Sequence, residues 1–244
     1  MQLLNLGYYG GYRGYGYGFD LTYLLVIAGA LLCMIASARV QSTYKKYSQI
    51  RSTSGMTGAE VAEEILRRNN LSDVSVCHVP GNLTDHYDPR TRTVNLSDAT
   101  YGSQSVAAIG VAAHECGHVM QHHTGYLPLN IRSALVPVAN IGSKLGLPIV
   151  FIGLIFSLTP LARIGIWVFS IAVAFQIVTL PVEFNASNRA MAMLGEYGIL
   201  AQDELPYSRK VLSAAALTYV AAAASSILQL LRLIMIVGGG RRRD

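Results

Sequence analysis

Residues 105–123 read SVAAIGVAAHECGHVMQHH and contain, at 114–118, two histidines separated by Glu-Cys-Gly. The alanine, valine and isoleucine residues before them recur at helical spacing, which predicts a buried helix from about Gln104 to His122. Gly125 and Pro128 follow and are expected to mark its end. On a helix, residues four apart lie one above the other on the same face. The pattern therefore predicts two imidazoles side by side on one buried helix.

His114 and His118, on one helix face, can offer two ring nitrogens to a single zinc ion. Glu115 projects from nearly the same side, where its carboxylate can act as a base toward water at that ion. Cys116 points away from the histidine face and is interpreted as a small packing residue. This HExxH motif predicts a site for one Zn²⁺, with Glu115 as the catalytic residue.

The composition of the chain predicts a membrane protein. Of its 244 residues, 52% are hydrophobic and only 14% are charged, whereas soluble domains have roughly 25% charged residues. Four uncharged stretches approach the length of about 20 residues that crosses the hydrocarbon core. These stretches are Leu21–Ala38, Leu145–Ala162, Ile164–Val182 and Val211–Leu231.

A polar segment between the first two stretches carries both helix and strand signals. The Thr-x-x-Glu spacing at 57–60 is that of a capping box and predicts a helix from Ala59 to about Arg68. Alternating residues predict short strands at Val74–Val79 and Thr91–Leu96, the second as an edge against which an extended peptide can pair. A turn is expected at 86–90. The predicted fold is mostly α, with about four transmembrane helices and a small α+β zincin-like catalytic region.

Glu183 follows the third apolar stretch directly, in the sequence PVEFNASNRA at 181–190. An unpaired carboxylate at the edge of the hydrocarbon is costly and needs a partner, and a zinc ion already held by two histidines is a suitable one. Two apolar stretches, an even number, separate His118 from Glu183, so both residues return to the same side of the membrane. Glu183 is therefore the predicted third metal ligand.

These segments predict the organisation of the whole chain. It comprises a Gly/Tyr-rich tail at 1–20, a transmembrane helix at 21–38, a catalytic region at 39–132, a transmembrane hairpin at 133–182, a third-ligand helix and loop at 183–210, and a transmembrane or membrane-associated helix with a basic tail at 211–244. Residues 131–143 are expected to join the second stretch in one bent helix, with a tight turn at 159–163. Residues 191–209 are expected to form a further short helix.

Basic residues flank the apolar stretches unevenly, which predicts the orientation. The face with the metal site is expected to hold Arg39, Lys45, Lys46, Arg51, Arg132, Arg189, Arg209 and Lys210, and the opposite face Arg13 and Arg163. This excess predicts a cytoplasmic site, although Arg241–Arg243 conflict with it if the last stretch crosses completely. The net charge of +5, placed beside apolar stretches, suits anionic lipid head groups as partners rather than nucleic acid.

HECGH at 114–118, DHYDPRTRTVNLSDATY at 85–101, VEFNASNRA at 182–190 and the four apolar stretches resemble the YugP-type neutral zinc metallopeptidases of bacterial membranes. The chain is more distantly similar to HtpX-like and CAAX-prenyl-protease gluzincins, whose third ligand lies in an E-F-x-A-D pattern. Glu183 matches that ligand, and Ser187 replaces the aspartate that supports a metal-binding histidine. Asn188, or water held by Ser187, is expected to take the place of that aspartate.

The resemblance implies a membrane-bound zinc metalloendopeptidase in the bacterial cell (inner or plasma) membrane, acting on membrane or membrane-proximal protein or peptide substrates. Glu115 would take a proton from the attacking water and pass it to the leaving amine. A donor to the oxyanion is expected as well. Arg189, His122 and Tyr207 are the candidates, and the sequence does not choose among them.

Three other interpretations compete with this one. An intramembrane site-2-type protease would carry an aspartate within a span, and none of the four apolar stretches contains one. A non-catalytic zinc-binding scaffold would usually close its site with four protein ligands, whereas three are found here with a glutamate in the base position. A membrane protein with an accidental motif would bind no zinc, which metal analysis tests.

Overall fold

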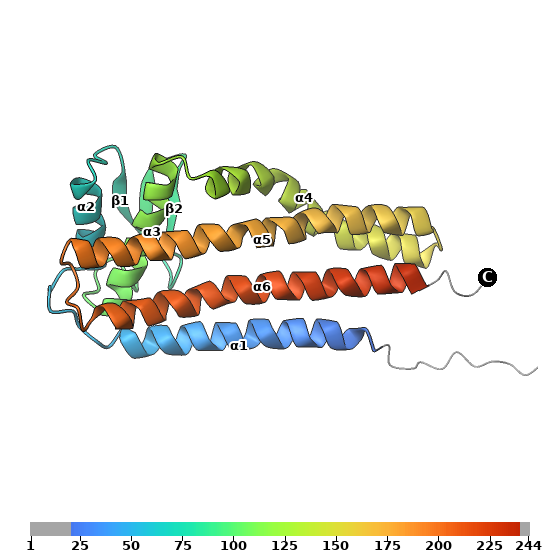
Figure 1. The fold of residues 1–244 in the computed structure, drawn as a ribbon, viewed down its shortest axis with the longest axis horizontal. Helices are drawn as coiled ribbons and strands as arrows, with labels where there is room; N and C mark the ends of the chain where they lie inside the picture. Colours follow the sequence, from blue (N-terminus) through green and yellow to red (C-terminus); the bar gives the residue numbers. More distant parts are fainter. Residues whose placement is uncertain (1–20, 240–244) are drawn as a thin grey trace, which may run out of the picture.

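The computed structural model describes residues 21–239, which are organised around long helices. Four of the described helices are long and apolar enough to cross a membrane, by length and composition. These are α1 (Tyr23–Tyr47), α4 (Leu127–Ile155), α5 (Thr159–Glu196) and α6 (Leu205–Gly239). They form an elongated bundle with a small α+β region at one end (Figure 1). The predicted fold class is confirmed. The predicted tail at 1–20 and Arg241–Arg243 lie outside the described residues.

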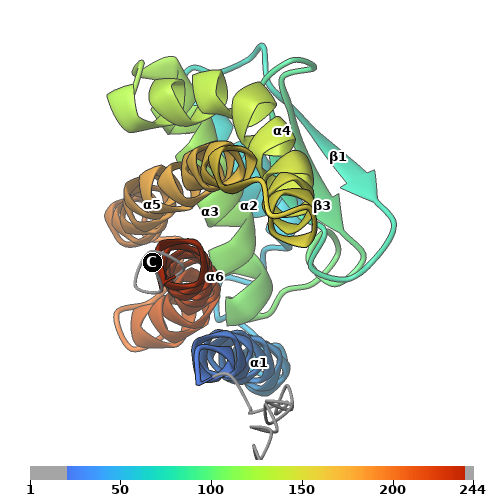
Figure 2. The ribbon, with the colours of Figure 1, turned by 90° about the vertical axis from the view of Figure 1, so that its right-hand side faces the viewer.

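The four long helices pack in the order α1, α6, α5, α4, as the view along the bundle shows (Figure 2). Small residues let neighbouring helices approach closely. A Cβ added at Gly29 of α1 would lie 2.6 Å from Ser225 Oγ of α6. A Cβ added at Gly153 of α4 would clash with the backbone nitrogen of Ala162 of α5. Such contacts are typical of helices that associate within a membrane.

The hairpin of α4 and α5 corrects one predicted boundary. Residues 131–143 do join the second apolar stretch in one helix, which contains Pro137 and Pro148 and bends toward α5 (Figure 1). However, the chain reverses at 156–158, where Ser157 has a φ of 56°. The prediction of a single span at 145–162 is therefore wrong. The sequence did not reveal the turn because uncharged residues continue through the reversal. Pro160 lies in the first turn of α5, where proline suits a helix start rather than its end.

Helix α5 extends well past the membrane boundary predicted at Val182. It continues to Glu196, and Gly198, with a φ of 65°, follows its end. The short helix predicted at 191–209 is therefore wrong, since its first residues belong to α5 and its last to α6. Helix α5 continues past Val182 because Ala186, Ala190 and Leu194 form a buried stripe that packs against the α+β region.

The α+β region contains α2 (Gly58–Arg68) and a sheet of β1 (Ser75–Val79), β2 (His86–Asp88) and β3 (Thr93–Ser97). The strand order is β1-β3-β2, with β1 parallel and β2 antiparallel to β3.

Two predictions are corrected by this order. The predicted turn at 86–90 begins with a strand, and the strand predicted as an edge is central. Asp85 holds β2 in place, because its carboxylate accepts hydrogen bonds from the backbone nitrogen and hydroxyl of Ser97, at 2.8 and 2.9 Å.

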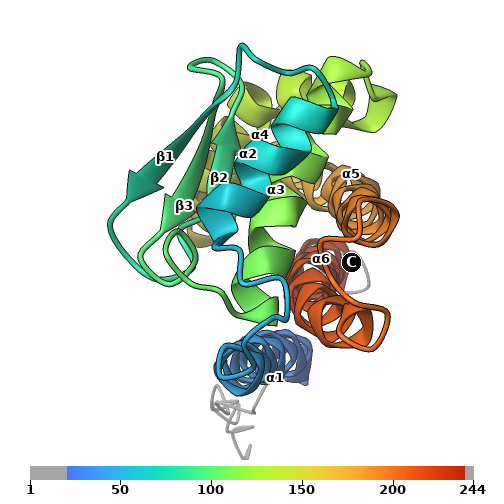
Figure 3. The ribbon, with the colours of Figure 1, turned by 90° about the vertical axis from the view of Figure 1, so that its left-hand side faces the viewer.

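Helix α3 (Val106–His123) lies between the two parts of the molecule, with α2 and the sheet on one side and α5 and α6 on the other (Figure 3). Ser105 caps its N-terminus by accepting a hydrogen bond from the backbone nitrogen of Ala108 at 3.1 Å. Ile109, Ala112 and Cys116 are buried in the core that α3 shares with α2 and α5. The helix predicted from the HExxH segment is confirmed, and it lies across the end of the membrane bundle.

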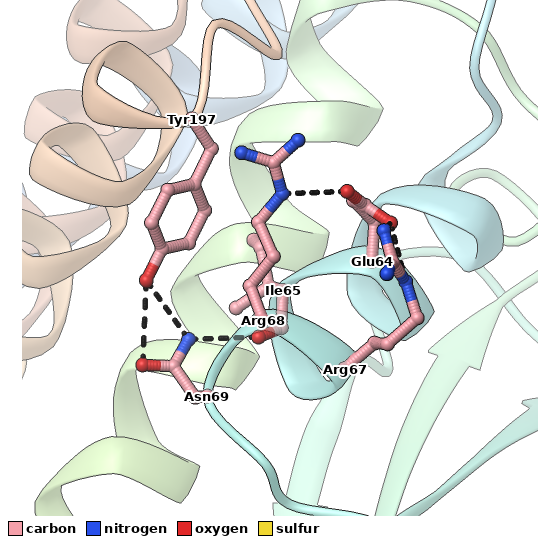
Figure 4. Close-up of polar contacts among 6 residues, drawn as sticks. All are labelled: Glu64, Ile65, Arg67, Arg68, Asn69 and Tyr197. Carbon is pink, nitrogen blue, oxygen red and sulfur yellow. Dashed lines mark hydrogen bonds and ion pairs between the residues drawn. The ribbon is translucent and has the colours of Figure 1, made fainter.

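Helix α2 is fixed at both ends. Thr57 and Glu60 form the predicted capping box, in which each side chain bonds the other residue's backbone nitrogen. At the C-terminal end, the Asn69 side chain exchanges hydrogen bonds with the hydroxyl of Tyr197, just past α5, at 3.0 and 3.3 Å (Figure 4). Arg68 lies over the Tyr197 ring and pairs with Glu64. These contacts join α2 to the extension of α5 that carries the candidate site.

Candidate metal centre

His114 and His118 of α3 and Glu183 of α5 converge at one point. The Nε2 atoms of His114 and His118 lie 3.4 and 3.7 Å from Oε2 of Glu183. The candidate ligand atoms of the three residues all lie within 4.8 Å of one another. Gly117 makes this approach possible, because a Cβ there would lie 2.5 Å from the carbonyl oxygen of Ala186 on α5. The glycine between the histidines is therefore part of the site's construction.

The three side chains fit a zinc ion. Glu183 is buried, and its Oε2 has no hydrogen-bond partner in the described part of the chain, although it faces two imidazole nitrogens. A buried carboxylate oxygen without a hydrogen bond is costly, and a divalent cation held between these atoms would reduce that cost. Two histidine nitrogens and one carboxylate oxygen form a donor set that zinc accepts in catalytic sites, where a fourth position stays open.

The electrostatics of the cluster also favour positive charge. Burial alone would lower the pKa of His118, but the nearby carboxylates of Glu183 and Glu115 outweigh it, so the pKa of His118 is raised. The carboxylates therefore create a site that attracts positive charge between the helices.

Ser187 supports His114 from the side away from the metal position. Its hydroxyl lies 3.1 Å from Nδ1 of His114, which leaves Nε2 directed to Glu183. Ser187 thus lies where the resemblance places an aspartate, one helical turn after the ligand Glu183. Asn188 is exposed and lies outside the two cavities that adjoin the metal position.

Gln121 supports His118 in the same way. Its Oε1 lies 3.0 Å from Nδ1 of His118, and its amide nitrogen donates to the carbonyl oxygen of Val182 and to Asn185 Oδ1, at 2.7 and 3.0 Å. This buried side chain ties the histidine to the residue before Glu183. Sequence reasoning missed Gln121, although its i,i+3 spacing from His118 was a usable signal.

Two cavities meet at the metal position. They share Asp85, His114, Glu115, Glu183 and Tyr219. One, of about 240 Å³, is mostly apolar beyond these residues; Val40, Leu83, Val111, Leu212, Ala215 and Ala216 line it together with Ser187 and Thr218, and we call it the apolar cavity. The other, of about 230 Å³, has more polar side chains in its lining, which consists of His86, Tyr87, His118, His122, Asn130, Arg132 and Ser133 with Pro89 and Leu129; we call it the polar cavity. Glu115 is buried and lines both, so its carboxylate lies where the two cavities join.

A family model described as "Putative neutral zinc metallopeptidase" matches residues 22–238, nearly the whole chain. The chain belongs to this zinc metallopeptidase family. It is also 47% identical over 198 residues to a Bacillus subtilis (strain 168) protein named "Putative membrane protease YugP". The aligned region covers 81% of this chain and 88% of that protein. No solved structure matches. The resemblance to YugP-type neutral zinc metallopeptidases is confirmed, and the zinc of the family name agrees with the His114, His118 and Glu183 cluster.

The candidate oxyanion donors named from the sequence lie in different places. His122 lines the polar cavity, with its Nδ1 3.3 Å from the Tyr87 hydroxyl. Arg189 bonds to Asn185 Oδ1 at 2.8 Å and lines neither cavity. Tyr207 stacks on Tyr47 with ring centroids 5.5 Å apart, also outside both cavities. Of the three, only His122 is brought to the candidate site.

Arg132 and Tyr219 are two further polar residues that sequence reasoning did not place at the site. Nη1 of Arg132 lies 3.9 Å from Oε1 of Glu183, and its Nε is buried without a hydrogen-bond partner in the described residues. Tyr219, on α6, lines both cavities. A phenol within an alanine-rich apolar stretch was a signal for Tyr219. Arg132 offered none beyond its charge, since only the fold of α4 brings it to Glu183.

Proposed function

We propose that the protein is a membrane-bound zinc metalloendopeptidase that hydrolyses peptide bonds in membrane or membrane-proximal proteins. The observation that carries the proposal is the convergence of His114, His118 and Glu183 beside a buried Glu115, where two cavities meet. A purely structural zinc site needs neither a glutamate in that position nor open space around it.

Glu115 is the proposed proton carrier. When bound, zinc supplies Lewis-acid chemistry, in that it lowers the pKa of water to about 7 and polarises a carbonyl group. The carboxylate of Glu115 accepts the proton that the attacking water loses and then delivers it to the nitrogen of the leaving amine. Its low exposure, 7%, limits contact of that carboxylate with bulk water, which favours proton transfer within the site.

Tyr219 and Arg132 are the proposed donors to the oxyanion. Both line the cavity that contains Glu115, and each offers a polar hydrogen that is suited to a developing negative charge. His122 lines the same cavity and is proposed to contact substrate. Ser187 and Gln121 are proposed as positioning residues, because they act through the two histidines.

Strand β2 is the proposed docking edge for the substrate backbone. It lies at the edge of the sheet, and His86 and Tyr87 line the polar cavity. An extended peptide that pairs with a free strand edge gains backbone hydrogen bonds. A peptide bound there would pass the metal position with side chains in a polar cavity on one side and an apolar cavity on the other.

We place the site on the cytoplasmic side of a bacterial cell membrane. Arg39 follows the apolar part of α1, and Arg209 and Lys210 precede that of α6. The C-terminal end of α1 and the N-terminal end of α6 both lie at the end of the bundle that carries the α+β region (Figure 1). Positive residues beside spans favour the cytoplasmic face. Thiol labelling of a cysteine introduced near residue 90 tests this, and labelling from outside intact cells would contradict it.

The proposal is tested with the purified full-length protein, by zinc analysis and by cleavage of casein. Wild-type protein should hold about one zinc, His114→Ala should lose it, and Glu115→Gln should keep it while cleavage is lost. Glu63→Gln, the same change at an exposed position of α2, is the matched control. If Glu115→Gln still cleaves, the base role is wrong. If zinc-loaded wild-type protein cleaves neither casein nor membrane peptides, a non-catalytic zinc-binding scaffold is favoured instead.

A further inference from the structure

A basic groove runs between α1 and α6, separate from both cavities at the metal position. It has a volume of about 540 Å³ and is lined by Arg39, Ser42, Thr43, Lys46, Tyr47, Arg209, Lys210, Ser213, Ala214 and Leu217. Four of these residues are cations, three carry hydroxyls on short side chains, and none is acidic. We call this set of residues the basic groove.

The four cations lack acidic partners in the described part of the chain. Arg39, Lys46, Arg209 and Lys210 are all exposed, and none is within 4.0 Å of a described carboxylate. Lys46 and Lys210 lie instead over the ring of Tyr47, at 5.6 and 6.0 Å from its centroid. Ring faces attract cations only weakly, so the groove keeps a concentrated positive charge that suits an anion.

The position of the groove identifies the source of that anion. Arg39 is the first charged residue after the apolar stretch of α1, and Lys210 is the last before that of α6. Both helices therefore change from apolar to basic at the same level, where the head groups of a bilayer lie. Ala214 and Leu217 continue the groove one to two turns into the apolar part of α6. The groove is basic at its aqueous end and apolar at its membrane end, which matches an amphiphile.

We propose that the basic groove binds the phosphate head group of one anionic phospholipid, with the start of an acyl chain against Leu217. Arginine and lysine side chains from two helices surround the phosphate, and the hydroxyls of Ser42, Thr43 and Ser213 supply further donors. This inference does not depend on peptidase activity.

The bound lipid would join two helices that also form the apolar cavity at the metal position. Val40 of α1 and Ala215 and Ala216 of α6 line that cavity, and each is a sequence neighbour of a groove residue. The lipid thus contributes to holding the α1–α6 wall of the candidate active site.

Native mass spectrometry of the full-length protein in neutral detergent tests the proposal, with added phosphatidylglycerol or phosphatidylcholine as probes. No charged bilayer surface is present in detergent, so general attraction to a membrane is absent. Arg39→Gln/Arg209→Gln removes one cation from each helix. Lys45→Gln/Arg51→Gln removes the same charge from exposed neighbours outside the groove and is the matched control. Ser213→Trp fills the groove without changing its charge.

We expect one retained phosphatidylglycerol per chain, bound about tenfold or more tighter than phosphatidylcholine. The affinity should fall about tenfold or more in Arg39→Gln/Arg209→Gln, since each substitution removes a charge-assisted hydrogen bond to the phosphate. It should also fall in Ser213→Trp and stay within about twofold in the control, with zinc content unchanged throughout. Equal losses in the control, or equal retention of the two lipids, would overturn the proposal. Displacement by inorganic phosphate at the same concentration as lipid would show that the groove binds free phosphate rather than lipid.

Discussion

Gly117 offers the most direct test of how the candidate metal centre is built. A Cβ at this position would lie 2.5 Å from the carbonyl oxygen of Ala186, and 3.0 and 3.1 Å from its carbonyl carbon and Cα. All three atoms belong to the backbone of α5, so no side chain can rotate away. Because real Cβ contacts essentially never fall below 3.0 Å, Gly117→Ala must move α3 and α5 apart by 0.5 Å or more, the difference between 3.0 and 2.5 Å.

That movement acts directly on the three candidate ligands. Gly117 precedes His118, and Ala186 lies three residues after Glu183 on the same helix. Zinc–ligand distances tolerate changes of about 0.2 Å, so a separation of this size removes Glu183 from bonding distance or strains both helices. We expect zinc affinity to fall by about a hundredfold, and the overpacked core to lose roughly 1–3 kcal/mol of stability.

Competition with a chromophoric zinc chelator measures the affinity, and thermal unfolding of the detergent-solubilised protein measures the stability. Gly110→Ala is the matched control, since it lies on the same helix but faces α6. Its Cβ would lie 3.1 Å from the Cβ of Ser208, a contact that a shift of a few tenths of an ångström relieves. Gly110→Ala should therefore keep zinc affinity within about twofold to threefold. If Gly117→Ala binds zinc as tightly as wild-type protein, the close approach of α3 and α5 does not position the ligands.

Three further predictions concern single side chains. Gln121→Ala should lower zinc affinity about tenfold to a hundredfold, because His118 loses the acceptor at its Nδ1; chelator competition measures this, and unchanged affinity contradicts it. Tyr219→Phe should lower kcat about a hundredfold while zinc content stays constant, as expected for a lost oxyanion donor; a change in KM alone would assign it to substrate binding. Hydrogen bonds from the backbone and hydroxyl of Thr57 lower the pKa of Glu60, so the charged form stabilises the fold above about pH 4.5, and this contribution is lost as the pH falls through the lowered value. Glu60→Gln should therefore reduce the melting temperature at pH 7 and match wild-type protein at low pH; an equal difference at both pH values would exclude the ionised cap as the cause.

The features that follow from the sequence alone are those set by near neighbours in the chain. The spacing of His114 and His118 fixes two imidazoles on one helix face, because helical geometry alone relates residues four apart. The capping box at Thr57 and Glu60 is equally local. Uninterrupted apolar stretches predict four membrane helices because crossing depends on length and composition. Glu183 could be predicted from the sequence for a related reason, since counting spans places it on the same side of the membrane as His118.

The features that only the tertiary structure decided join residues far apart in the chain. Uncharged residues run through the α4–α5 reversal, so hydropathy could not locate the turn at 156–158. The strand order places β2 rather than β3 at the edge, which depends on pairing partners and not on alternation. Arg132 and Tyr219 reach the metal position from α4 and α6, although neither belongs to a motif. The sequence by itself determined the chemistry of the ligands, because that chemistry lies in local spacing. The shape of the space around them was decided by long-range packing, such as the backbone contact at Gly117 that brings α3 against α5.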